Sequence, residues 1–136
     1  MDMKLKVVVV PVSDVDRAKE FYSEKMGFNV DVDNTFGDVR IVQLTPPGSG
    51  CSITFMKGFG AKMEPGSLQA LQLTVSDIRA AHAELSGRGV AVSEVQKVDQ
   101  EKGEFVPLEG EAEPYNGFIF FDDPDGNGWA IQQGPG

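Results

Sequence analysis

The first candidates for chemistry in this sequence are polar side chains inside otherwise apolar segments. Gln72 and Thr74 interrupt one such segment, Gln132 interrupts a second, and Thr54 interrupts a third. Burying an amide or a hydroxyl group costs free energy unless the group is hydrogen-bonded. These side chains therefore bind one another, water or a ligand, and for Thr54 an internal partner is the favoured alternative.

Nucleophilic and metal chemistry have few candidate residues. The chain has one histidine, His82, and one cysteine, Cys51. His82 lies in a predicted helix at the edge of its apolar stripe, and Cys51 begins a predicted strand with no histidine near it in the sequence. A cysteine nucleophile needs a partner base. We therefore interpret His82 as a surface residue at a helix border and Cys51 as a small passive side chain.

The segment Asp123 to Gly128 (DPDGNG) imitates the beginning of a calcium-binding loop. Such a loop requires a glutamate at its twelfth position, which is Gly134 in this chain. Pro124 also lies inside the segment. Because proline and glycine favour turns, the segment is predicted to be the turn of a hairpin.

Residues 99–113 form an acidic segment with a single lysine, Lys102. Its carboxylates are Asp99, Glu101, Glu104, Glu109, Glu111 and Glu113. One interpretation is an acidic lid whose electric field attracts a cationic ligand. The alternative is a solvated loop anchored by a few apolar side chains such as Phe105, and it is the favoured one.

The elements that must position these residues come from a duplication. Val12-Ser13-Asp14 recurs as Val75-Ser76-Asp77, after an apolar segment and before a helix-like one in both copies. Such a repeat indicates two copies of one supersecondary unit. Ser13 or Asp14 is expected to cap the first helix.

Each copy is predicted to have the element order βαβββ. The first helix carries an apolar stripe of Val15, Ala18, Tyr22 and Met26, and it ends at Gly27. A turn is expected at 34–38, and 97–116 show no clear period. Strands are predicted at 5–10, 28–32, 39–44, 52–56, 68–75, 90–95, 118–121 and 129–132, with the second helix at 77–86.

Composition bounds the class of protein. The formal net charge is −9, and the lysines and arginines are scattered. Because nucleic-acid binding needs a basic patch, nucleic acid and anionic membrane surfaces are not expected partners. No stretch approaches the about 18 apolar residues of a membrane span, and no signal peptide is recognisable. We therefore expect a cytoplasmic protein without a disulfide.

Three features together resemble the vicinal oxygen chelate superfamily, which includes glyoxalases, bleomycin-resistance proteins, fosfomycin-resistance enzymes and extradiol dioxygenases. They are the two βαβββ units, the motif PVSDVDRAKEFYSEKMGF (Pro11 to Phe28) and the motif DPDGNGWAIQ (Asp123 to Gln132). The resemblance implies an α+β fold with one domain over 1–136, in which two modules form a curved mixed sheet around a cavity. Module one spans 4–57, a linker spans 58–67, and module two spans 68–133.

The resemblance also implies where metal-dependent members hold their ligands. These positions are Val7 and Ala70, seven residues before each capping aspartate, the region of Thr54, and Ala130 or its neighbours Ile131 and Gln132. None of these residue types supplies the imidazole, thiolate or carboxylate that divalent metals require. The family pattern also turns Ala130 towards the cavity, so Trp129 is expected to pack under the helices because neighbouring strand residues face opposite ways.

The expected function is therefore a metal-independent small-molecule-binding protein of the bleomycin-resistance type that sequesters an antibiotic or a metabolite. No cofactor is expected, the ligand is expected to be cationic, and the resemblance implies a homodimer. The predicted binding residues are Gln72, Thr74, Gln132, Thr54, Phe118, Phe120 and Tyr115.

Two alternatives remain open. The first is a metal-free isomerase, lyase or cyclase acting on an oxygenated small molecule, with Glu94 or Glu104 as general base. The second is a metal-dependent glyoxalase or dioxygenase with relocated ligands.

Overall fold

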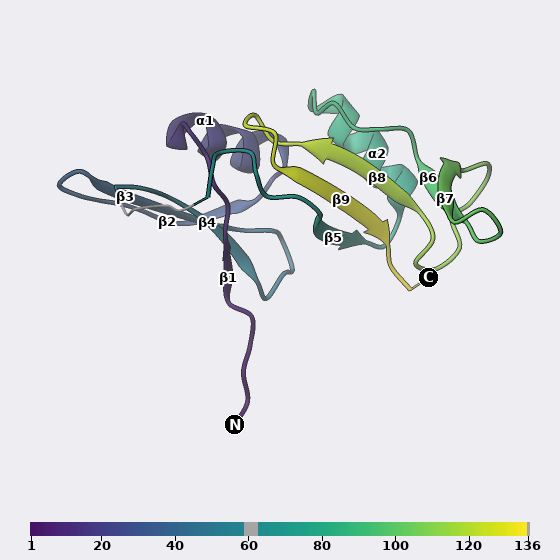
Figure 1. Cartoon of the computed structure of the whole chain (residues 1–136), viewed down its shortest axis with the longest axis horizontal. Coiled ribbons are helices and arrows are strands. Elements are labelled where there is room, and N and C mark those ends of the chain that lie inside the picture. Colours follow the sequence, from purple (N-terminus) through teal and green to yellow (C-terminus); the bar gives the residue numbers. More distant parts are fainter. Residues whose placement is uncertain (59–62, 136) are drawn as a thin grey trace. The chain divides into compact units, whose positions relative to one another are not determined.

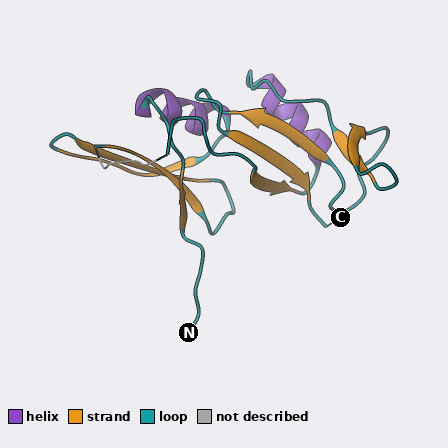
Figure 2. Cartoon of the chain, viewed as in Figure 1, coloured by secondary structure: helices purple, strands orange, loops and turns teal. Residues whose placement is uncertain are grey.

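The computed structural model describes residues 1–58 and 63–135, and the chain divides into two compact units. Unit 1 comprises Met1–Leu68 and Asp123–Asn127, and unit 2 comprises Gln69–Asp122 and Gly128–Gly136. Within each unit, a helical segment covers one face of a sheet (Figures 1 and 2). Residues 59–62 of the predicted linker lie outside the described residues.

Unit 1 contains a four-stranded mixed sheet in the order β1-β4-β3-β2. The edge strand β1 is parallel to β4, and the other pairs are antiparallel. Its elements are β1 (Val7–Val9), α1 (Val15–Glu20), the π-helical turn η1 (Phe21–Lys25), β2 (Asn29–Phe36), β3 (Val39–Thr45) and β4 (Ser52–Lys57).

The first helix forms as its apolar stripe predicts. Asp14 is its N-cap and accepts a hydrogen bond from the backbone N–H of Arg17 at 3.1 Å. All four predicted stripe residues (Val15, Ala18, Tyr22 and Met26) are buried. The Tyr22 ring lies 5.7 Å from the ring of Phe55 in β4, so the stripe packs on the sheet. Gly27, with φ of 77°, follows the helix in a conformation that suits glycine.

Unit 2 contains a five-stranded mixed sheet in the order β5-β9-β8-β6-β7. The edge strand β5 is parallel to β9, which repeats the arrangement of β1 and β4, and the remaining pairs are antiparallel. Its elements are β5 (Leu71–Val75), α2 (Ile78–Gly87), β6 (Gln96–Asp99), β7 (Glu104–Pro107), β8 (Phe118–Asp122) and β9 (Gly128–Gln133). Asp77 caps α2 by accepting from the N–H groups of Arg79 and Ala80.

The prediction of a strand at 90–95 is wrong. Val90 and Val95 are buried, but the chain between them is irregular. Two hydrogen bonds of Ser93 take the place of strand pairing with β8. Its backbone N–H donates to Phe120 O, and its hydroxyl oxygen accepts from Phe120 N–H, both at 2.9 Å. The strand β6 begins at Gln96 and continues into 97–116, where no period was expected, and β7 lies wholly within that range.

The second strand is longer than predicted and contains a β-bulge. β2 continues to Phe36, so the predicted turn at 34–38 is reduced to Gly37 and Asp38. Its register with β3 shifts between Val30 and Val32. The bulge changes which face each later side chain occupies.

The turn Asp123–Asn127 is a hairpin turn, as predicted, and the side chain of Asp123 is buried. Asp123 is 5% exposed and accepts from the Tyr22 hydroxyl at 2.7 Å and from the Asn127 side-chain amide at 2.8 Å. Its other oxygen accepts from the backbone N–H groups of Asp125 and Asn127. Protein donors therefore occupy this carboxylate, which leaves it unsuited to bind calcium.

Candidate functional site

The side chains predicted to bind a ligand meet on one face of the unit 2 sheet. Gln72 and Thr74 of β5 pair with Ala130 and Gln132 of β9. Phe118 and Phe120 of β8 pair with the same two β9 residues. Because paired residues share a face, five predicted residues lie together: Gln72, Thr74, Gln132, Phe118 and Phe120. We call this surface the aromatic face.

The helix α2 covers the opposite face of the same sheet. Gln133, which alternates with Gln132, accepts from the backbone N–H of Ile78 at the start of α2. Trp129 is buried on this side and lies parallel to Phe121 with ring centroids 6.0 Å apart. The prediction that Trp129 packs under the helix and Ala130 faces away from it is therefore confirmed for unit 2.

Phe105 completes the aromatic face and was not among the predicted site residues. It lies in β7 and contacts Phe118 and Phe120 edge-on, with ring centroids 5.3 and 5.1 Å away. Phe118 and Phe120 are parallel at 6.4 Å. At 48% exposure, the Phe105 ring keeps much of its surface open for a ligand. The signal that could have identified it is its position as the single phenylalanine in the acidic segment.

Ala130 is the small residue in the middle strand of the aromatic face. It lies between Gln72 on one neighbouring strand and Phe120 on the other. Neighbouring strands are about 4.8 Å apart, so the side chains of Gln72 and Phe120 stand roughly 10 Å apart across the small alanine. This width suits a flat ring that stacks on Phe120 and accepts or donates a hydrogen bond at Gln72.

The polar side chains of this face differ in whether they form hydrogen bonds within the protein. Gln72 and Thr74 are exposed, and neither side chain has a hydrogen-bond partner among the described residues. The Gln132 amide nitrogen donates to the carbonyl of Tyr115 at 2.9 Å. Tyr115 has φ of 61°, a left-handed conformation that is strained for a bulky residue, and it is 59% exposed. Gln72 and Thr74 are therefore the groups most ready to meet a ligand.

Thr54, the remaining predicted residue, belongs to unit 1. It is buried in β4, and its hydroxyl donates to Val42 O at 2.9 Å. An internal partner thus satisfies it, the alternative that the sequence favoured.

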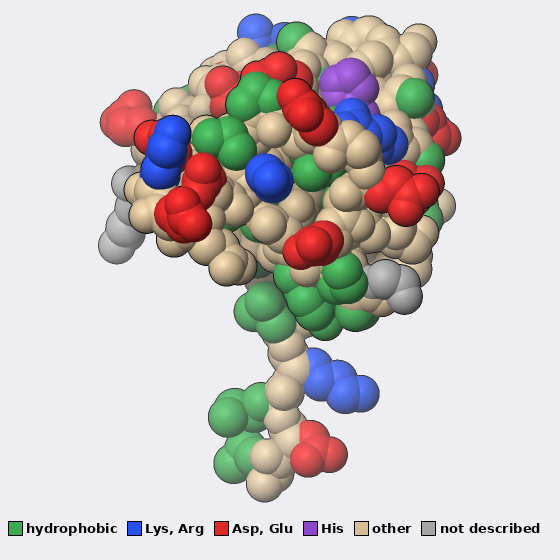
Figure 3. All heavy atoms as spheres, turned by 90° about the vertical axis from the view of Figure 1, so that its right-hand side faces the viewer, with side chains coloured by type: hydrophobic (Ala, Val, Ile, Leu, Met, Phe, Trp, Pro, Cys, Tyr) green, Lys and Arg blue, Asp and Glu red, His purple; other side chains and the backbone are tan. Residues whose placement is uncertain are grey.

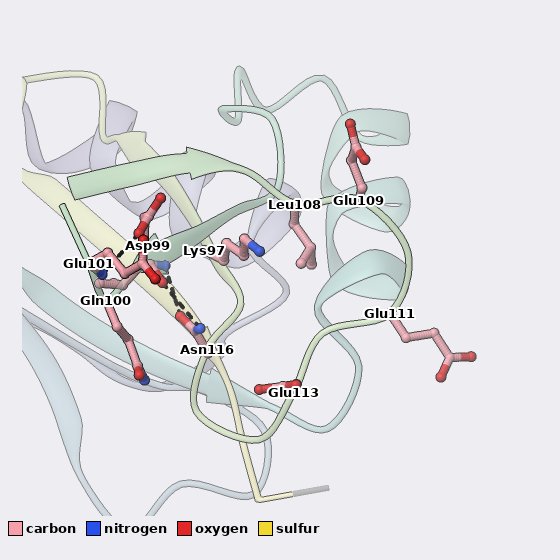
Figure 4. A pocket seen from close by; sticks show the side chains of 10 residues that line it. Lys97, Asp99, Gln100, Glu101, Leu108, Glu109, Glu111, Glu113 and Asn116 are labelled. Atoms are coloured by element: carbon pink, nitrogen blue, oxygen red, sulfur yellow. Dashed lines mark hydrogen bonds between the residues drawn. The ribbon is translucent and has the colours of Figure 1, made fainter. Parts of the chain in front are cut away.

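An acidic hollow of about 560 Å³ lies beside β6 in the same unit (Figure 4). Asn116 supports it, with its side-chain carbonyl accepting from Val98 N–H at 2.8 Å. Glu109 and Glu111 point away from the other labelled side chains in Figure 4. The charged residues that line the hollow are Lys97, Asp99, Glu101, Glu109, Glu111 and Glu113. Their divergence suits a general negative field better than chelation of one ion.

The donor set does not fit a resident divalent metal. The positions implied by the resemblance hold Val7, Ala70, Thr54 and Ala130, and the Thr54 hydroxyl is already engaged. Across residues 1–58 and 63–135, no three His, Cys, Asp or Glu side chains are grouped so that they could hold a metal ion. We therefore derive no chemical step through a metal.

Candidate catalytic groups are dispersed. His82 is half-buried on α2, and Figure 3 shows the single histidine side chain at the surface. Cys51 is half-buried, and its thiol contacts Ser52 O. Glu94 and Glu104, the candidate general bases, are both exposed. These placements leave both glutamates in contact with solvent rather than enclosed in a dry pocket.

The comparisons with known proteins agree with this architecture. The family model described as Glyoxalase/Bleomycin resistance protein/Dioxygenase superfamily matches residues 4–131. The search of curated proteins returned no match. None of the helices in the described part of the chain is long and apolar enough to cross a membrane.

Two similar solved structures come from Streptomyces sp. CB03234. TnmS3, an antibiotic binding protein, is 33% identical, with 98% of this chain and 97% of that chain covered and a TM-score of 0.76. A glyoxalase/bleomycin resistance protein is 34% identical, with coverages of 96% and 100% and a TM-score of 0.73. A superfamily member from Sphaerobacter thermophilus DSM 20745 is 25% identical, with coverages of 97% and 98% and a TM-score of 0.71.

Proposed function

We propose that this chain, which belongs to the glyoxalase/bleomycin resistance protein/dioxygenase superfamily, is a small-molecule-binding protein that holds its ligand without a metal ion. It sequesters an antibiotic or a metabolite rather than converting it. The observation that carries this proposal is the aromatic face, where three phenylalanine rings share a surface with Gln72 and Thr74, whose side chains have no hydrogen-bond partner among the described residues. The similarity to an antibiotic binding protein at 33% identity supports the same ligand class.

The ligand that fits this face contains a flat ring system with at least one hydrogen-bonding group. Phe118 and Phe120 offer stacking surface, and Phe105 offers an edge. Gln72 and Thr74 supply a row of polar groups on β5, beside Ala130 and Gln132 of β9. Small-molecule sites typically combine apolar walls with a few such polar groups.

Electrostatics favour a cationic ligand. The formal net charge is −9, and most charged residues around the acidic hollow are carboxylates. A negative field raises the local concentration of cations and speeds their association. The homodimer implied by the resemblance is part of the proposal, and sedimentation equilibrium tests it.

Thermal-shift measurements test the proposal most simply. Bleomycin A2 and a set of planar aromatic antibiotics are added to the protein before and after treatment with EDTA. We expect at least one compound to raise the melting temperature equally in both samples, because a ligand of the folded state stabilises it. Mass spectrometry is expected to recover that compound unchanged. A shift that EDTA abolishes, or conversion of the compound, would contradict the proposal.

A further inference from the structure

The face of the unit 1 sheet opposite α1 carries a carboxylate that the proposed function does not use. Strand β2 contains Asp31 and Asp33, and a regular strand would place both on the same face. The register shift between Val30 and Val32 makes Asp31 the extra residue of a bulge. Asp31 consequently meets Gln43 on one face, whereas Asp33 lies on the other.

Asp33 is fully neutralised on the side of α1. Arg40 donates to its two oxygens from Nε at 3.0 Å and from Nη2 at 2.9 Å. Lys19 adds a third charged donor at 2.8 Å. Asp33 is therefore a structural carboxylate with two cationic partners.

Within the described part of the chain, the hydrogen-bond donors to Asp31 are all neutral. The Asn29 amide donates to its Oδ1 at 2.8 Å, the Gln43 amide to its Oδ2 at 3.4 Å, and the Thr45 hydroxyl also donates to Oδ2. No described Lys or Arg forms an ion pair with Asp31. These hydrogen bonds, that of Thr45 above all, hold the pKa of Asp31 below its usual value. The carboxylate is therefore negative at neutral pH, and no described lysine or arginine balances its charge.

The hydrogen bonds around Asp31 have a fixed direction. Thr45 and Ser52 hydroxyl oxygens lie 2.6 Å apart. A hydroxyl has one proton, and Thr45 gives its proton to Asp31, so Ser52 must donate to Thr45. The chain orders the carboxylate without reducing its charge.

The remaining acceptor capacity of Asp31 selects the kind of cation. Oδ2 already accepts two hydrogen bonds, whereas Oδ1 accepts one and keeps a free lone pair. A guanidinium group in its preferred bidentate mode uses both oxygens for two parallel hydrogen bonds. An ammonium group needs a single acceptor, so it fits this carboxylate better.

Apolar surface continues the same face beyond Asp31. Ile41 and Met56 are half-buried and pair across β3 and β4 on this side. Met56 and Val9 also line a hollow of about 340 Å³. A charged acceptor followed by apolar surface matches a molecule with an amine at the end of a hydrocarbon portion.

We propose that Asp31 anchors a second subsite, on unit 1, that binds the ammonium group of an amine-bearing small molecule. This inference rests on the proposed function, because it assigns a chemical class to the ligand. The ammonium group donates to Oδ1 of Asp31, and its hydrocarbon portion lies against Ile41 and Met56.

Dansylcadaverine and its N-acetyl derivative test the subsite, because they differ in the ammonium charge and share the fluorescent ring. Each is titrated into nitrogen-15-labelled protein, and the side-chain amide signals of Asn29 and Gln43 are followed by NMR. We expect dansylcadaverine to shift both signals and the N-acetyl compound to leave them in place. Asp31→Asn is expected to weaken dansylcadaverine binding about tenfold or more, as for loss of a charge-assisted hydrogen bond.

Asp33→Asn is the matched control, since it removes the other aspartate of the same strand. We expect its affinity for dansylcadaverine to stay within about twofold of the unchanged protein, while its melting temperature falls. Unmoved amide signals, equal shifts with the N-acetyl compound, or unchanged affinity in Asp31→Asn would each overturn the subsite.

The experiment distinguishes failure of the proposed function from failure of the subsite. Binding of the uncharged N-acetyl compound and its loss in Phe120→Ala report on the aromatic face alone. If that binding is absent while the amide signals respond to dansylcadaverine, the subsite stands and the aromatic-face proposal fails. The reverse pattern supports the aromatic face and overturns the subsite.

Discussion

The two sheets present different chemistry on the faces that their helices leave uncovered. In unit 2 this face combines three phenylalanine rings with the amide of Gln72. In unit 1 the corresponding face carries the ionised Asp31 within a group of neutral donors. The helix-covered faces are alike, with Leu44 and Ile131 both buried. The duplicated units thus share their packing and differ in the surface that can recognise a ligand.

The largest expected effect falls on a helix-covered face. Ile131→Ala is expected to lower the free energy of unfolding by about 2–5 kcal/mol, because it leaves a cavity around a residue that is 1% exposed. Urea denaturation measures this change. Thr74→Ala, on the uncovered face of the same sheet, is the control and is expected to stay within about 0.5 kcal/mol. Equal losses in the two variants would break the distinction between the faces.

Removing one ring from the aromatic face is expected to lower affinity rather than stability. Phe120→Ala should weaken binding of the N-acetyl dansyl probe by about 2–3 kcal/mol, because stacking and buried apolar area are both lost. Fluorescence titration measures the affinity. Phe121→Leu, on the covered face, should instead lower the free energy of unfolding and keep the affinity. A reversal of these two outcomes would contradict the assignment of the faces.

Gln72→Leu tests the polar row of the same face. We expect a loss of ligand affinity of about 1–3 kcal/mol, the cost of an unmade buried hydrogen bond in the complex. Stability should change little, because Gln72 is exposed in the free protein. Calorimetric titration with a compound that raises the melting temperature gives the affinity. Equal affinity in the variant would remove Gln72 from the site.

The smallest effect concerns Asp33 and depends on pH. Arg40 and Lys19 hold the pKa of Asp33 far below its ordinary value. Its stabilising contribution is therefore present at neutral pH and is lost as the pH falls below about 4, where the unfolded carboxyl becomes protonated. The stability difference between the unchanged protein and Asp33→Asn should be at most about 1 kcal/mol at pH 7 and shrink towards pH 2. A difference that grows on acidification would contradict this sign.

Local patterns in the sequence predict both helices and part of the aromatic face. Each capping aspartate stands before an apolar stripe, and Asp14 and Asp77 both cap their helices in the structure. Alternation in the last strand placed Trp129 and Ala130 on opposite faces, as found. These features depend on neighbouring residues, which is why a single sequence can reveal them.

Features that depend on distant pairing were missed. The acidic residues of β6 and β7 interrupt the alternation that would predict a hairpin. Phe105 was therefore interpreted as an anchor of a loop, whereas it belongs to an aromatic group. Simple alternation would place Asp31 and Asp33 together, and only the pairing of β2 with β3 reveals the bulge that separates them. The apolar residues Val90 and Val95 suggested a strand because both are suited to burial, and both are buried. The segment between them is irregular, and the Ser93 hydroxyl accepts the hydrogen bond from Phe120 N–H.

The most direct test of the central claim is a fluorescence titration of N-acetyl dansylcadaverine into EDTA-treated protein and into Phe120→Ala. Metal-independent binding on the aromatic face predicts a saturable signal in the unchanged protein, the same dissociation constant with and without EDTA, and at least about tenfold weaker binding in the variant. No saturable signal, equal affinity in the two proteins, or binding that EDTA abolishes would contradict the account.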